Sequence, residues 1–95
     1  MDEEELEEVY RKLMERRAPD SPAARALTLS KQILMAGSIE AAAEPLFGLI
    51  DLLSKVEGRE RFMVVFSAKL LPFACTGAGG KVFEGMAERM ETGER

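Results

Sequence analysis

The stretch that decides the fold is Phe62–Cys75, FMVVFSAKLLPFAC, in which Lys69 is the only charged residue among fourteen. On a helical wheel the apolar residues of this stretch cover every side, and β-branched residues are few. We therefore expect a helix near 59–71 and not a strand. A helix that is apolar on all sides has to be buried on all sides. It must lie at the centre of a small bundle or bury its second face in a partner.

Two sets of side chains on this helix are expected to have different roles. The first set forms the central seam of the core and comprises Phe62, Phe66, Leu70 and Phe73, with Leu49, Ile50 and Leu53 as neighbours. The second set is a surplus apolar face, Val64, Ala68 and Leu71, which pairs with a second copy in a homodimer together with Met86 and Met90 of the last predicted helix, 81–91. Because Pro72 cannot continue the hydrogen-bond ladder, the helix should end or kink near Leu71.

The rest of the chain carries the sequence signals of a series of helices. Apolar residues recur with a helical period, which predicts helices at 3–17, 22–36, 39–57 and 81–91. Ser21 and Ser38 are placed as N-caps, and Gly58 is placed where the helix 39–57 closes. Pro45 should kink this helix or restart it. The sequence thus predicts an all-α bundle of four to five short helices in one domain, 1–95, with a frayed tail at 92–95.

Composition excludes several classes of function. The chain has no histidine and one cysteine, so histidine-based catalysis, zinc sites and disulfides are not expected, and we predict neither a metal nor a cofactor. The net charge of −4 comes entirely from residues 1–20, which hold eight acids and four bases. We interpret this acidic segment as the solvated face of the first helix. A chain without a cationic stripe is not expected to bind nucleic acid.

The compartment is inferred from the same features. No apolar run reaches the roughly 18 residues that a membrane span needs. The acidic N-terminus is unlike a secretory signal, and a lone thiol is typical of a reducing environment. We therefore expect a cytoplasmic protein without a membrane span.

Three features could carry chemistry. The turn before the last predicted helix could bind an anion through Gly77, Gly79, Gly80 and Lys81. Lys69, placed among apolar residues, could form a Schiff base, and Cys75 could be an activated thiol. For each of them a structural role is the simpler interpretation: a permissive turn, a solvated lysine and a small core residue.

The segment 33–75 contains Ala36-Gly37-Ser38-Ile39-Glu40 followed by leucine-rich helices. It resembles small helical accessory subunits of redox complexes such as formate dehydrogenase, a resemblance that implies a partner chain and no catalytic residue. The main prediction from the residues is a non-enzymatic interaction or assembly module that binds itself or another protein chain. The alternatives are a small ligand-binding or catalytic domain that uses Lys69, Cys75 or the turn 76–81, and an accessory subunit of a larger complex.

Overall fold

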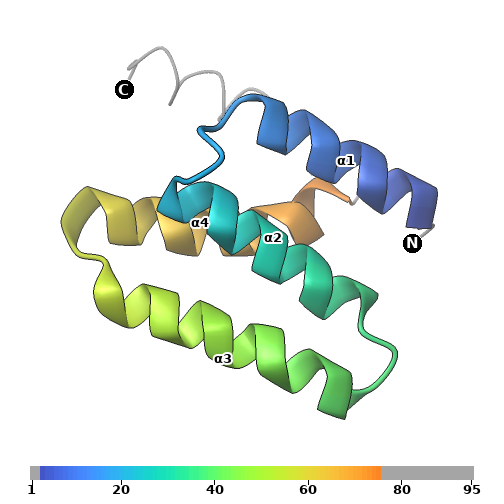
Figure 1. Cartoon of the computed structure of the whole chain (residues 1–95). Helices are drawn as coiled ribbons and strands as arrows, with labels where there is room; N and C mark the ends of the chain where they lie inside the picture. Colours follow the sequence, from blue (N-terminus) through green and yellow to red (C-terminus); the bar gives the residue numbers. More distant parts are fainter. Residues whose placement is uncertain (1–2, 76–95) are drawn as a thin grey trace.

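The protein is an all-α bundle, as the sequence predicts. The computed structural model describes residues 3–75, and this part of the chain contains helices and no strand. The helices are α1 (Glu3–Glu15), α2 (Pro22–Met35), α3 (Ile39–Lys55) and α4 (Gly58–Ala74) (Figure 1). The further helix predicted at 81–91 lies outside the described residues, as do the turn 76–81 and the tail 92–95.

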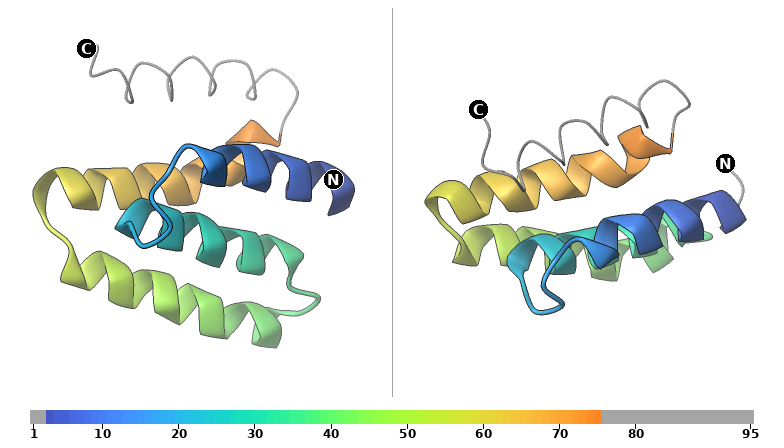
Figure 2. Two further views of the ribbon diagram at one scale, coloured as in Figure 1. Left: turned by 45° about the horizontal axis from the view of Figure 1, so that its top comes forward. Right: turned by 90° about the horizontal axis from the view of Figure 1, so that it is seen from above.

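The helices α2 and α4 form the middle of the bundle, and α1 and α3 flank them. The two middle helices contact each other and both flanking helices, whereas α1 and α3 do not contact one another. Consecutive helices run in opposite directions, so α2 and α4 run parallel and begin at the same end of the molecule (Figures 1 and 2). The central position of the apolar helix α4 agrees with the sequence prediction.

Two clusters of buried side chains make up the core of residues 3–75. The cluster between α1, α2 and α4 consists of Leu6, Leu13, Leu27, Leu70 and Leu71. The cluster between α2, α3 and α4 consists of Ala26, Leu52, Val56 and Val64. Because both clusters use α2 and α4, these two helices hold the flanking helices in place.

The expected caps are present at the helix ends. The hydroxyl oxygens of Ser21 and Ser38 accept hydrogen bonds from the backbone N–H groups of Ala24 and Ala41, each at 3.1 Å. Pro22 follows Ser21 as the first residue of α2, where its missing N–H costs no helical hydrogen bond. Gly58 joins α3 to α4 with a φ of +60°, a conformation that glycine adopts without steric cost.

Neither proline ends its helix, contrary to one of the predicted outcomes. Pro45 lies inside α3, where its ring is buried, and this burial offsets the lost hydrogen bond. Pro72 lies inside α4, which continues to Ala74. A proline at 72 leaves the carbonyl of Ala68 without its helical donor, and the Ser30 hydroxyl of α2 donates to that carbonyl at 3.1 Å. A contact between helices thus replaces the missing backbone bond.

The buried face of α4 differs from the predicted seam. Leu70 is buried as expected and Phe66 is partly buried, but Phe62 and Phe73 are 59% and 46% exposed. The face that packs inward carries Val64, Ser67, Leu70 and Leu71. The residues of α2 buried in the bundle are mostly small, namely Ala23, Ala24, Ala26 and Ser30 beside Leu27. A close α2–α4 contact of this kind admits a valine or a serine more readily than a phenyl ring.

Candidate interaction surface

One face of α3 is apolar and exposed to solvent. We define the α3 apolar face as Ile39, Leu46, Phe47 and Ile50, which are 91%, 46%, 67% and 54% exposed. Leu46, Phe47 and Ile50 follow Ile39 by seven, eight and eleven residues, a spacing that places all four on one side of the helix. Single exposed apolar residues are common on protein surfaces, but four large ones in a continuous stripe are typical of an interaction site.

The position of α3 at the edge of the bundle explains why this face is uncovered (Figure 1). The opposite side of the helix carries its two buried residues, Pro45 and Leu52. Gly48 permits a close approach there, because a Cβ atom at this position would lie 3.1 Å from a methyl carbon of Leu29. With α2 and α4 on that side and no contact to α1, the outward stripe has no neighbour among the described helices.

Charged side chains line one edge of the α3 apolar face. Glu40 stands in the first turn and Lys55 in the last turn of the helix, with Glu44 and Asp51 between them. All four are exposed, and Lys55 Nζ lies 2.8 Å from a carboxylate oxygen of Asp51. The stripe therefore has the apolar centre and polar rim of a protein–protein interface.

This surface was not predicted from the sequence. Ile50 was expected among the neighbours of the core seam, whereas its side chain is more than half exposed. One feature of the sequence did point to an exposed apolar surface. The apolar residues of α3 are too many to be covered by neighbours on one side of the helix. Only the tertiary arrangement decides which of these positions remains in water.

The predicted α4 interface requires a correction. Val64 and Leu71 are fully buried in the chain's own core, so their assignment to a surplus outer face is wrong. Ala68 is half-buried, and its carbonyl accepts the Ser30 hydrogen bond. Met86 and Met90 lie outside the described residues. The apolar surface that the sequence placed on α4 is therefore covered at these positions by α1, α2 and α3.

The candidate reactive groups are not assembled into a site. Lys69 is exposed and therefore lacks the apolar surroundings expected of a Schiff-base lysine. Burial, together with the nearby charge of Glu5, raises the pKa of the Cys75 thiol. A raised pKa keeps the thiol protonated at neutral pH, which is the opposite of activation. The anion-binding candidates Gly77, Gly79, Gly80 and Lys81 lie outside the described residues.

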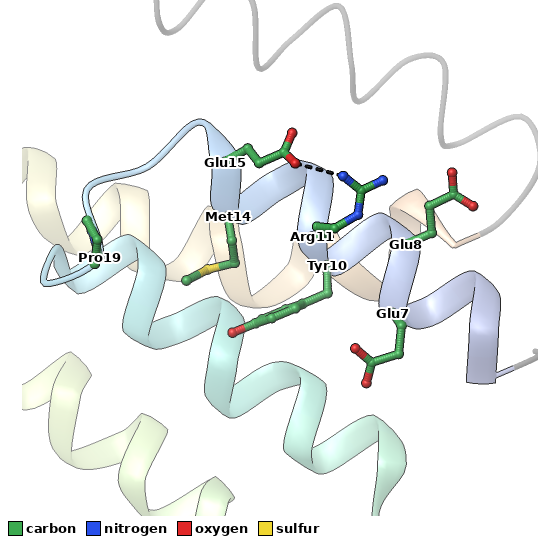
Figure 3. Close-up of a pocket in the computed structure, with 7 residues that line it drawn as sticks. All are labelled: Glu7, Glu8, Tyr10, Arg11, Met14, Glu15 and Pro19. Carbon is green, nitrogen blue, oxygen red and sulfur yellow. Dashed lines mark hydrogen bonds and ion pairs between the residues drawn. The ribbon is translucent and has the colours of Figure 1, made fainter.

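A depression of about 790 Å³ lies along α1 near the connection to α2 (Figure 3). It is lined by Glu7, Glu8, Tyr10, Arg11, Met14, Glu15 and Pro19. Its polar groups already have partners within the chain. Arg11 pairs with Glu15 at 2.7 Å, and Lys12 lies 3.8 Å from Glu8.

Tyr10 and Glu7 face α2 at the same place. The Tyr10 hydroxyl lies 2.9 Å from the hydroxyl oxygen of Thr28. Lys31 lies 4.4 Å above the Tyr10 ring and 2.8 Å from a carboxylate oxygen of Glu7. These contacts hold α1 against α2. They engage the polar side chains of this depression, which are therefore not available to bind a ligand.

Residues 3–75 contain no cluster of three or more potential metal ligands, and none of their helices is long and apolar enough to cross a membrane. Comparison of the whole chain with protein-family models, with curated proteins and with solved structures finds no match.

Proposed function

We propose that the chain is a non-enzymatic interaction module that forms a homodimer through the α3 apolar face. The observation that carries this proposal is the continuous exposed stripe Ile39, Leu46, Phe47 and Ile50. Removing a large aliphatic or aromatic side chain from water contributes roughly 1.5–3 kcal/mol when burial is complete. A second copy brings the same stripe, so a twofold pair covers both at once.

An antiparallel pair of α3 helices fits the charges beside the stripe. In that arrangement the first turn of one helix, with Glu40, approaches the last turn of its partner, with Lys55, and the helix dipoles oppose each other. A parallel pair would set Glu40 against Glu40 and Lys55 against Lys55. The remaining acids, Glu44 and Asp51, lie at the rim, where water and salt screen their repulsion.

The area available sets the expected affinity. The four side chains offer on the order of 500 Å² of apolar surface per copy, whereas a standard stable interface takes roughly 800 Å² from each partner. Leu34 and Met35, at the end of α2 shortly before α3 begins, are 38% and 40% exposed and are the nearest further apolar groups along the chain. We therefore expect a dimer of moderate affinity, which dissociates on dilution.

Light scattering over a micromolar concentration series tests the proposal. The wild-type chain should approach twice its monomer mass of 10.5 kDa. Phe47→Glu places a charge in the middle of the stripe and should leave only monomer. Phe62→Glu is the matched control, because Phe62 is similarly exposed but belongs to α4, and it should dimerise as the wild type does. A constant monomer mass for the wild type, or loss of the dimer in both variants, would contradict the assignment.

Cysteine cross-linking tests the direction of the pair. The experiment uses a background in which Cys75, the only native cysteine, is replaced by serine. Leu46→Cys lies near the middle of an antiparallel pair, with its two copies offset by only about 4–5 Å along the helices, and should form an intermolecular disulfide. Ile39→Cys should not, because its two copies would stand about 25 Å apart along the helices. Disulfides at both positions would indicate a parallel pair, in which each residue faces its own copy.

A further inference from the structure

A second cleft, independent of the α3 apolar face, lies where α2 and α4 begin. It has a volume of about 380 Å³ and is formed by the connection after α1 and the first turns of α2 and α4. Its lining comprises Arg16, Arg17, Ala18, Ser21, Pro22, Ala23, Arg59, Glu60 and Met63. Because α2 and α4 run parallel, both helix N-termini are at this end of the molecule (Figure 2). A volume of this size is in the range of small-molecule sites.

Two of the three arginines that line this cleft stand apart from the ion pairs of the bundle. Arg11, Lys12, Lys31 and Lys55 are the cations that take part in ion pairs between described residues. Arg16 and Arg59 are in none of these pairs. Glu60 is the only acid that lines the cleft, so Arg16 and Arg59 alone already outnumber the negative charge.

The placement of Arg59 opposes the usual electrostatics of a helix. A cation in the first turn of α4 lies against the partial positive charge of the helix N-terminus, where an acid is normally favoured. The N-cap residue of α4, Glu57, makes no capping hydrogen bond with its side chain, and the first turn of α2 holds no acid. Glu60 is the acid in the first turn of α4, so the two helix ends, Arg16 and Arg59 face one cleft whose lining supplies a single carboxylate, and a bound anion is favoured there.

Apart from Ser21, whose hydroxyl caps α2, the remaining lining is apolar. The side chains of Ala18, Pro22, Ala23 and Met63 carry no polar atom that could bind a hydrophilic ligand. Guanidinium groups bind phosphate oxygens through paired hydrogen bonds, and helix N-termini favour the same anion. We propose that this cleft binds a small organic phosphate, with the phosphate held by Arg16 and Arg59 and an apolar group resting against Met63 and Pro22.

Phenyl phosphate, titrated into the full chain by calorimetry, is the direct test. Saturable binding in the wild type should weaken about tenfold in Arg59→Gln and in Arg16→Gln, because each variant loses a charge-assisted hydrogen bond. Arg61→Gln is the matched control, since Arg61 is an exposed arginine in the same turn of α4 that does not line the cleft, and it should bind as the wild type does. Far-UV circular dichroism of each variant checks that the fold is retained.

Three outcomes would overturn the proposal. The first is an absence of saturable binding at millimolar phenyl phosphate, and the second is an equal loss in all three arginine variants. The third is equal binding of benzoate, which would assign the cleft to carboxylates. Inorganic phosphate should bind more weakly than phenyl phosphate if the apolar floor contributes. A phosphate monoester occurs both in free small molecules and in lipid headgroups. Sedimentation with vesicles that contain phosphatidic acid distinguishes these two sources, because a chain whose site takes a free ligand should not sediment with the vesicles.

Discussion

Replacement of Leu71 by alanine is the most direct test of the core described above. The side chain is fully buried and belongs to the cluster that joins α1, α2 and α4. Deleting its outer carbons removes transfer free energy and leaves a cavity, since three helices surround the site and collapse only partly. Substitutions of this kind cost about 2–5 kcal/mol, and the complete burial of Leu71 indicates a value of roughly 3–4 kcal/mol. That is a large share of the total stability of about 5–15 kcal/mol expected for a domain of this kind.

Urea denaturation followed by circular dichroism at one fixed protein concentration measures this loss. The midpoint should fall while the dependence on urea stays unchanged, because the mutation alters stability and not the surface exposed on unfolding. Leu46→Ala is the matched control: the same chemical change at a residue that is 46% exposed should cost less than about 1 kcal/mol. A loss below about 1 kcal/mol for Leu71→Ala, or equal losses for both variants, would refute the placement of Leu71 in the core.

Further predictions concern the two buried serines and the cysteine. Ser30→Ala should lower the free energy of unfolding by about 1–3 kcal/mol in the same urea assay, because it removes the donor to the Ala68 carbonyl, which Pro72 leaves without a helical partner. Ser67→Ala should be neutral or stabilising by up to about 1 kcal/mol, because the Ser67 hydroxyl is fully buried without a hydrogen bond, and a clear loss of stability would argue against this. Burial raises the pKa of Cys75, so alkylation by iodoacetamide should rise at higher pH in the folded chain than in urea. Because the pKa of Cys75 is higher in the folded than in the unfolded chain, the protonated thiol stabilises the fold at neutral pH, and this stabilisation is lost as the pH rises through the folded pKa. Alkylation profiles that coincide for the folded and the urea-unfolded chain would exclude the pKa shift.

The sequence alone determined the helices and where most of them begin. A helical period, a serine before each of two helices and a glycine at the α3–α4 junction are signals that act within one or two turns, so they do not depend on distant parts of the chain. Ser21 and Ser38 cap the helices that the sequence assigned to them, and the all-α class follows from these signals. The prolines were harder to interpret, because the partner that replaces the hydrogen bond lost at Pro72 is Ser30, a residue of another helix.

The tertiary structure decided which faces are buried. Because α4 is apolar on every side, its sequence contains no preference between the face of Val64 and Leu71 and the face of Phe62 and Phe73. The choice follows from the small side chains of α2, which allow a close contact that large rings cannot enter. For the same reason the α3 apolar face could not be identified in advance: α3 has apolar residues on two sides, and its place at the edge of the bundle leaves one side in water. The arginine cleft likewise depends on the fold, since Arg16, in the connection before α2, and Arg59, at the start of α4, are far apart in sequence and line one cleft because α2 and α4 begin at the same end of the bundle.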